Sequence, residues 1–358
     1  MKLLILTQKV DIDDDVLGFF HNWIIELAKH YEKVTVICLE RGRHKLPRDI
    51  KVLSLGKDEF LRYPRHFWFL RKIVALLRFY RYIFEERSNY DKVFVHMNQE
   101  YVLLGGFFWK MWFKKIFLWR NHPKGSFLTN IAIFLSDKVF CTSKFSYTAK
   151  FSKTELMPAG IETDNFKNLN YLLEKNTVNL LSLGRISPIK DLETLLKSLV
   201  VVKKNNIKFF LNIVGDSNNR DKQYFEQIKK LVIELNLEKD VKFWGKINHK
   251  KTLEFYNKND IFINLTGSGS FDKTILEAMS CEKFALVCNE SFRDIFPKEW
   301  HDIMIFKQGD ENDLANKIIK LSKIEKEKKE LIGSNARKIV IEKHSFSSLI
   351  NRIINFLK

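Results

Sequence analysis

The sequence alternates short apolar or β-branched segments with longer helical patterns, and this alternation runs twice along the chain. The first run begins with "KLLILTQ" and the second with "NLLSLGR". Strands that alternate with helices pair in parallel, because each right-handed crossover returns the chain to the same edge of the sheet. We therefore expect two doubly wound α/β domains that face each other across a cleft, with ligands at the carboxyl ends of the strands.

A turn-rich polar segment, "MPAGIETDNFKNLNYLLEKNT", separates the two runs, and the strand pattern restarts at about residue 177. A chain of 358 residues is also long for one ordinary domain. We expect a Rossmann-like N-terminal domain over residues 1–165 and a Rossmann-like C-terminal domain over residues 177–338. A last helix over residues 339–358 is expected to pack back on the N-terminal domain.

Positive charge and aromatic residues are concentrated together in residues 61–124. The formal net charge is +18, and this segment has 13 Lys and Arg against 4 Asp and Glu, with four of the seven tryptophans. In "RYPRHFWFLRKIVALLRFYRYIFEER" the polar residues Arg71, Arg78 and Glu85 recur every seven positions, so the apolar surface is wider than one core-facing stripe.

Such a helix can lie in the headgroup layer of an anionic membrane, with its cations on lipid phosphates. The alternative is a buried interdomain or dimer helix with snorkelling arginines. Nucleic acid is not an expected partner, because no recognition motif accompanies the charge and wide apolar faces suit it poorly.

The N-terminus, "MKLLILTQKVDIDDD", passes from a short apolar run to acids without a small-residue cleavage site, so we expect a first strand rather than a signal peptide. No window of about 18 apolar residues lacks charge, and no spanning helix is expected.

The four cysteines lack metal-ligand spacing, which indicates reduced and mostly buried thiols. The expected location is the cytoplasm, peripherally on the inner face of the cell membrane.

Three segments of the second half place polar or glycine residues directly after predicted strands. In "LSLGRISPIKDLETLL", Gly184 ends a strand, and Arg185 and Lys190 bracket a loop before a helix, a seat suited to a diphosphate. In "LNIVGDSN", Gly215 permits a close turn. In "TGSGSFDKTILEAM", a Gly/Ser loop leads into a helix that carries Glu277.

Together with "VKFWGKI", these segments resemble the donor-binding domain of the group 1, family 4 retaining glycosyltransferases, which have the GT-B fold. The resemblance is strong over about residues 178–290 and extends to the remainder by layout. It implies that Arg185 and Lys190 neutralise a nucleotide diphosphate and that Glu277 holds the ribose hydroxyls. It also implies that the donor is bound by Gly184 and by the loop residues Ser270, Phe271, Asp272 and Lys273.

The sequence departs from the family pattern at Gly269, where the family usually has an acid that binds the donor sugar. Either other groups such as Ser270 or Asp272 orient the sugar, or activity is weak. Glu277 also has a structural interpretation, because Thr274 and Glu277 have the spacing of a capping box.

In the first half, the resemblance implies that Gly18, after the first strand, approaches the donor phosphate, with His21 a weaker candidate. The acids of "DIDDD" include the D-x-D spacing with which a different glycosyltransferase fold holds a divalent metal. A solvated acidic loop is the favoured interpretation, and no metal is expected.

Two histidines follow predicted strands in this half, His96 in "VFVHMNQE" and His122 in "LWRNHPKG". The family keeps a histidine in this region that faces the reacting sugar. We choose His122 as the catalytic histidine, because its Asn-His-Pro loop cannot continue the strand, and keep His96 in reserve. Either could instead be a structural histidine.

The resemblance implies transfer of a sugar from a nucleotide diphosphate sugar to a hydroxyl with retention, without a cofactor. The membrane-facing first half suggests a lipid-linked glycan or glycolipid acceptor in cell-surface polysaccharide synthesis. The alternative is a catalytically degenerate, nucleotide-sugar-binding scaffold subunit of such a pathway. A dinucleotide-dependent oxidoreductase would need G-x-G-x-x-G after the first strand, and the sequence lacks it.

Overall fold

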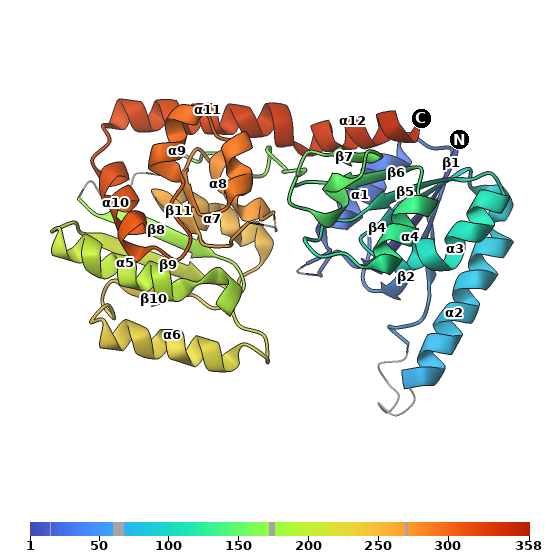
Figure 1. The fold of residues 1–358 in the computed structure, drawn as a ribbon, viewed down its shortest axis with the longest axis horizontal. Helices are drawn as coiled ribbons and strands as arrows, with labels where there is room; N and C mark the ends of the chain where they lie inside the picture. The colour runs from blue at the N-terminus through green and yellow to red at the C-terminus, as the bar shows by residue number, and fades with distance from the viewer. Residues whose placement is uncertain (15, 60–67, 172–175, 269–270) are drawn as a thin grey trace. The chain divides into compact units, whose positions relative to one another are not determined.

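The computed structural model describes residues 1–358 except 15, 60–67, 172–175 and 269–270. It divides into two compact units, the first made of Met1–Met157 with Leu349–Lys358 and the second of Pro158–Ser348. Each unit is a parallel sheet flanked by helices (Figure 1). The predicted α/β class with two Rossmann-like sheets is therefore confirmed.

The described residues of the first unit form a seven-stranded parallel sheet with the order β3-β2-β1-β4-β5-β6-β7. Its central strand β1 has fully buried side chains at Leu3, Leu4, Ile5 and Leu6, as expected for a strand covered on both faces. The strands are β1 (Lys2–Val10), β2 (Lys33–Arg41), β3 (Lys51–Ser54), β4 (Lys92–His96), β5 (Lys115–Trp119), β6 (Lys138–Cys141) and β7 (Thr154–Leu156). The helices are α1 (Phe19–Ala28), α2 (Trp68–Glu85), η3 (Arg87–Asn89), α3 (Glu100–Met111), α4 (Phe127–Leu135), η4 (Tyr147–Lys150) and α12 (Phe346–Leu357).

In the second unit, the described residues form a five-stranded parallel sheet with the order β10-β9-β8-β11-β12. The strands are β8 (Val178–Leu183), β9 (Phe209–Val214), β10 (Val241–Phe243), β11 (Ile261–Asn264) and β12 (Phe284–Val287). The helices are η5 (Pro188–Lys190), α5 (Leu192–Lys204), α6 (Lys222–Glu234), η6 (His249–Lys251), α7 (Thr252–Asn257), α8 (Lys273–Ser280), η7 (Glu290–Asp294), α9 (Lys298–Met304), α10 (Glu311–Ser322) and α11 (Lys326–His344). The strand order reverses beside β8, which places the loop after β8 where doubly wound folds bind ligands.

The chain end passes from one unit to the other. The helix α11 ends at His344 in the second unit, and α12 begins at Phe346. Within the first unit, the ring of Phe356 lies 5.5 Å from that of Phe140, and Lys92 Nζ donates to the backbone carbonyl of Lys358 at 2.7 Å. The two chain ends therefore lie close together in this unit (Figure 1).

The turn-rich segment before β8 packs on the second unit. The backbone N–H of Leu169 donates to Asn257 Oδ1 at 2.7 Å, and the guanidinium of Arg337 donates to the carbonyls of Thr163 and Phe166 at 3.1 and 2.8 Å. Because these are fixed contacts to side chains of α7 and α11, residues 158–171 of this segment are part of the second unit's structure.

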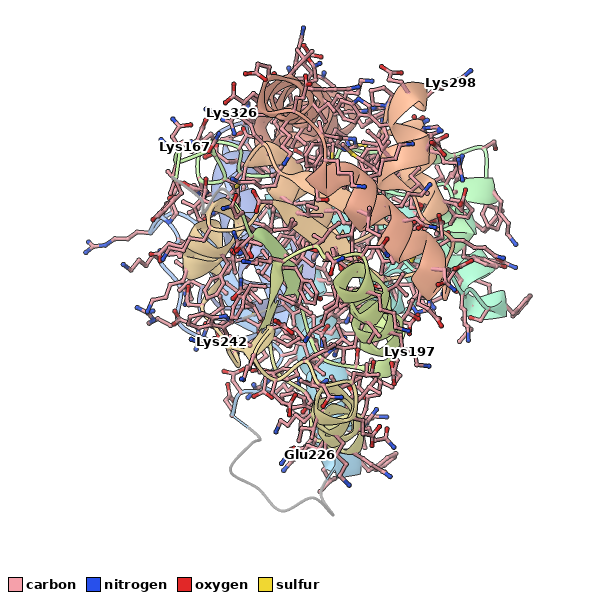
Figure 2. The ribbon with its side chains drawn as sticks, turned by 90° about the vertical axis from the view of Figure 1, so that its left-hand side faces the viewer. Lys167, Lys197, Glu226, Lys242, Lys298 and Lys326 are labelled. Atoms are coloured by element: carbon pink, nitrogen blue, oxygen red, sulfur yellow. The ribbon has the colours of Figure 1, made fainter. Side chains whose placement is uncertain are left out.

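The surface of the second unit carries lysines on many different elements. Figure 2 shows Lys197, Lys242, Lys298 and Lys326 projecting from α5, β10, α9 and α11, and all four are exposed. Positive charge is therefore spread over this unit and is not confined to the aromatic segment of the first unit. All four cysteines are free and buried, as expected. Among the described residues, we find no helix of the length and apolar character needed to cross a membrane.

Candidate functional site

The loop after β8 places Gly184, Arg185 and Lys190 at one small cavity in the second unit. The lining residues come from the carboxyl ends of β8, β9 and β11 and from the start of α5; they are Ser182, Leu183, Gly184, Arg185, Ile186, Lys190, Leu192, Ile213, Ile263, Asn264 and Leu265. Arg185 is exposed, whereas the Lys190 side chain lies across Gly184: a Cβ added there would be 3.4 Å from Lys190 Cε and 3.6 Å from its Nζ. Both cations therefore border the same space.

Gly215, after β9, brings the neighbouring loop against this one. Its φ of +138° is a conformation that residues with a Cβ rarely adopt. A Cβ at this position would lie only 1.8 Å from the carbonyl oxygen of Gly184. The close turn predicted here is confirmed, and any larger residue would displace the loop that carries Arg185.

The start of α8 meets the same loop through Asp272. Its carboxylate accepts from the backbone N–H and hydroxyl of Thr274, at 3.2 and 2.7 Å, and forms an ion pair with Lys190. Burial raises the pKa of Asp272, but the charge of Lys190 and these hydrogen bonds outweigh burial and hold the pKa below its ordinary value. The side chain that begins α8 thus also fixes the predicted diphosphate lysine.

The N-cap of α8 is Asp272 and not Thr274, so the capping-box interpretation of Glu277 does not hold. A Thr274 cap would start the helix at residue 275, whereas α8 starts at Lys273. The Asp272 carboxylate caps it by accepting from the backbone N–H of Thr274, which has no partner within the helix. This leaves Glu277 in the middle of α8 with its side chain in a buried environment.

Glu277 is held by two side chains from the neighbouring helical segments. It is 6% exposed, and its Oε2 accepts from the hydroxyl of the buried Tyr256 at 2.8 Å. Its Oε1 lies 3.1 Å from Nε2 of His249, and this hydrogen bond raises the pKa of His249. These two partners therefore fix the orientation of the carboxylate, and the His249 side chain beside Oε1 is 62% exposed.

The loop residues on either side of Asp272 are also accounted for. The Phe271 ring stacks on that of Phe292 with 5.4 Å between centroids. Burial lowers the pKa of Lys273 to about 8, against the opposing charges of Glu277 and Glu162. Ser270 and Gly269 lie outside the described residues, so the predicted donor contact of Ser270 is not placed.

In the first unit, Gly18 is the N-cap of α1, at the end of the loop that follows β1. A Cβ added to Gly18 would lie 2.5 Å from the carbonyl oxygen of Asp14, so the turn needs a glycine. The neighbouring His21 is buried in α1, where its Nε2 accepts from the backbone N–H of Lys45 at 3.0 Å.

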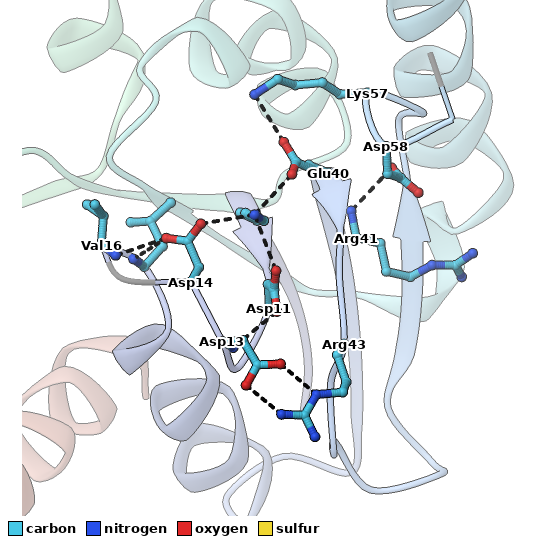
Figure 3. Close-up of polar contacts among 11 residues, drawn as sticks. Asp11, Asp13, Asp14, Val16, Glu40, Arg41, Arg43, Lys57 and Asp58 are labelled. Atoms are coloured by element: carbon cyan, nitrogen blue, oxygen red, sulfur yellow. Dashed lines mark hydrogen bonds and ion pairs between the residues drawn. The ribbon is translucent and has the colours of Figure 1, made fainter. Parts of the chain in front are cut away.

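The acids of the D-x-D spacing are engaged in ion pairs (Figure 3). Lys9 Nζ lies 3.2 Å from Asp11 and 3.0 Å from Asp14, and it also pairs with Glu40. Asp13 faces the Arg43 guanidinium through both carboxylate oxygens at 2.5 Å. The described part of the chain contains no group of three or more His, Cys, Asp or Glu side chains arranged to hold a metal ion.

The two candidate histidines occupy different environments. His96 is 1% exposed; it stacks on Phe20 with 3.8 Å between centroids, and its Nδ1 lies 3.2 Å from the Thr7 hydroxyl. His122 is exposed in the loop after β5, and its Nδ1 accepts from the backbone N–H of Lys124 at 3.0 Å. Of the two, His122 has the ring that a ligand can reach.

Helix α2, in the aromatic-rich segment 61–124, has one buried and one exposed side. On α2, Phe79 and Ile83 are buried in the core, whereas the side chains of Leu70, Ile73, Leu77 and Phe84 lie on an exposed stripe at helical spacing. The Phe84 ring packs against the ring of Phe108 on α3, and the Phe108 ring is in contact with that of Phe107, which is 68% exposed. The exposed stripe therefore extends from α2 onto α3. We call the stripe with Phe107 the aromatic–basic surface, because the exposed cations Lys72, Arg81 and Lys110 lie on the same two helices.

Residues 164–339 match the model of a protein family described as glycosyl transferases group 1. Residues 164–339 therefore belong to the group 1 glycosyltransferases. The matched residues contain the whole donor-side candidate site from Gly184 to Glu277. The first-unit candidates Gly18 and His122 lie outside the match.

Two curated relatives are similar in sequence to part of this chain. An uncharacterized glycosyltransferase of Methanocaldococcus jannaschii is 23% identical over 219 residues, which cover 61% of this chain and 58% of that protein. An alpha-monoglucosyldiacylglycerol synthase of Streptococcus pneumoniae is 29% identical over 162 residues, covering 40% of this chain and 35% of that protein. The matches thus span less than two thirds of either relative.

The fold is shared with solved structures along the whole chain. HepE of Anabaena, in complex with UDP, matches with a TM-score of 0.77 at 18% identity, covering 100% of this chain and 99% of that chain. This likeness identifies the GT-B fold.

Tyr256 and His249, the two hydrogen-bond partners of Glu277, are not among the site residues predicted from the sequence. They precede Glu277 by 21 and 28 residues, in a segment without a distinctive motif. No local signal could have found them, because only the packing of α7 and η6 beside α8 brings them to the carboxylate.

Proposed function

We propose that this group 1 glycosyltransferase transfers a sugar from a nucleotide diphosphate sugar to a hydroxyl group, with retention at the anomeric carbon. The observation that carries the proposal is the meeting of Arg185, Lys190 and the start of α8 at the carboxyl ends of parallel strands. Cations and helix N-termini in this position are suited to a diphosphate.

In the proposed reaction, the bond between the anomeric carbon and the diphosphate oxygen breaks, and the acceptor oxygen forms a new bond to that carbon on the same face. Negative charge develops on the leaving nucleoside diphosphate, and the acceptor hydroxyl passes its proton to the departing diphosphate oxygen and from there to solvent. Arg185 and Lys190 would stabilise this charge, which is the largest catalytic contribution available to such a site. No metal is needed in this scheme, because the two cations supply the positive charge.

The remaining side chains have positioning roles in the proposal. Glu277 would accept hydrogen bonds from the ribose hydroxyls, with Tyr256 holding the side chain in place. The exposed His122 would orient the sugar and the acceptor from the first unit. The backbone of Phe271, Asp272 and Lys273 would contact the phosphate and sugar.

The transfer reaction itself can be tested with purified protein and a panel of nucleotide diphosphate sugars. With a lipid extract as acceptor, we expect one donor to be consumed, with release of its nucleoside diphosphate and appearance of a glycosylated lipid. Binding of a nucleotide sugar without either transfer or hydrolysis would contradict the proposed enzymatic activity and favour a scaffold subunit. The observation that supports a scaffold subunit is the glycine at position 269, where the family usually has an acid.

For the acceptor, we propose a lipid-linked glycan or glycolipid reached at an anionic membrane surface. The aromatic–basic surface supports this, because Leu77 and Phe107 are 64% and 68% exposed and Lys72 is exposed on the same helix as Leu77. Two further cations of this surface are paired with acids, Arg81 with Glu85 and Lys110 with Asp137. One relative is named a synthase of a monoglucosyl diacylglycerol, which is a glycolipid. Each cation near an anionic leaflet contributes about 1 kcal/mol to binding, and inserted apolar side chains add to it.

The double variant Leu77→Ser/Phe107→Ser is expected to bind liposomes containing anionic lipid roughly tenfold more weakly than the wild type, since it loses two exposed apolar side chains. Flotation measures this directly. The matched control is Ile233→Ser/Leu331→Ser, which replaces two side chains of the second unit that are 60% and 61% exposed. Equal flotation of both double variants and the wild type, or no binding of the wild type to anionic liposomes, would remove the membrane proposal.

A further inference from the structure

Asp272 uses all the acceptor capacity of its carboxylate within the protein. Its Oδ1 accepts from the backbone N–H and the hydroxyl of Thr274, at 3.2 and 2.7 Å. Its Oδ2 accepts from Asn264 Nδ2 at 2.9 Å and from the Lys190 ammonium. Because a carboxylate offers about four acceptor positions, no vacant one remains for a sugar hydroxyl. The structure therefore gives Asp272 a different task from the sugar-binding acid that Gly269 replaces.

That task concerns the charge of Lys190. The ammonium donates to Asp272 and, at 2.8 Å, to the hydroxyl of Thr266. The two charged side chains are only 20% and 17% exposed, so solvent screens their interaction weakly. Without a ligand, the lysine assigned to the diphosphate is thus already neutralised by a fixed carboxylate.

We propose that Asp272 is an internal counter-ion of Lys190 that makes the site bind the nucleoside diphosphate product less well than it otherwise would, and so favours product release. The inference rests on the proposed function of Lys190. It assigns Asp272 a positioning and electrostatic role toward the leaving group, not contact with the reacting atoms.

The negative charge of the nucleotide increases during transfer. A nucleotide diphosphate sugar carries two negative charges at neutral pH, since both phosphates are esterified. The free nucleoside diphosphate has gained a terminal phosphate whose second ionisation lies near pH 6, so it carries about three. A fixed negative charge beside Lys190 repels the product more than the donor, and release of product limits turnover in many enzymes.

The variant Asp272→Asn tests this by removing the charge while keeping a residue that caps helices well. Calorimetric titration with UDP, GDP and ADP identifies which of them the wild type binds. We expect the variant to bind that nucleoside diphosphate roughly tenfold more tightly, as one unit charge removed at short range implies. Its affinity for the corresponding nucleotide sugar should rise by a smaller factor.

Two further variants complete the experiment. Asp310→Asn replaces the carboxylate that caps α10; Asp310 does not line the cavity, and this variant should leave both affinities unchanged. If the asparagine variant does not fold, the same affinities are measured for Asp272→Ser, which also retains a capping oxygen. Product binding no tighter than wild type in the folded Asp272 variants would overturn the counter-ion role, whereas transfer activity is measured separately. A wild type that binds none of the three nucleotides would overturn the proposed function and this inference with it.

Discussion

Replacing Lys190 with alanine is expected to lower kcat for sugar transfer by roughly 10²- to 10³-fold, as removal of one group that stabilises developing negative charge does in other enzymes. The same change leaves the Asp272 carboxylate without its cation in a largely buried position. We therefore expect the free energy of unfolding to fall by about 1–3 kcal/mol as well. Steady-state kinetics and urea denaturation measure the two effects.

The control is Arg185→Ala, because Arg185 lines the same cavity but is exposed. This variant should lose activity on the same scale while its unfolding free energy stays within about 0.5 kcal/mol of the wild type. If both variants kept near-normal kcat, the two cations could not be the groups that stabilise the leaving diphosphate. If both lost activity only in proportion to stability, their role would be structural.

Replacing Glu277 with glutamine is expected to raise the KM for the donor by roughly 10- to 100-fold. The amide can still accept from Tyr256, but hydrogen bonds between the ribose hydroxyls and a charged carboxylate are worth about 1.5–3 kcal/mol. Because the proposed contact is made equally to substrate and transition state, kcat should change much less than KM. Initial-rate kinetics with varied donor concentration measure both constants.

An activity-independent check on this variant is the titration of His249 by NMR. Its pKa is raised in the wild type mainly by the hydrogen bond to Glu277, so it should fall toward the ordinary histidine value in Glu277→Gln. A fall in the His249 pKa with an unchanged donor KM would show that Glu277 orders this corner of the second unit without binding the ribose.

Some of this arrangement can be predicted from the sequence because it is local. Alternating strands and helices determine two parallel sheets, and the carboxyl ends of parallel strands lie at one edge. A glycine and two cations that follow such a strand must therefore lie at that edge, as Gly184, Arg185 and Lys190 do. Their spacing along the chain is enough to bring them together.

Other features depend on packing between distant segments and leave no local trace. The ion pair between Lys190 and Asp272 joins residues 82 positions apart, and the Tyr256 hydroxyl reaches Glu277 only because α7 lies beside α8. The alternative helix start at Thr274 fits the sequence equally well, and only the structure shows that the aspartate two residues earlier caps α8. His96 and His122 both follow strands, and only the aromatic side chains around His96 separate a buried ring from an exposed one.

A crystal structure of the protein with the nucleoside diphosphate that it binds would locate the diphosphate directly. We expect both phosphates to lie at the cavity after β8, within hydrogen-bonding distance of the Arg185 guanidinium and the Lys190 ammonium, with the ribose at Glu277. A diphosphate bound elsewhere, with these two cations directed away from it, would show that Arg185 and Lys190 do not bind the leaving group.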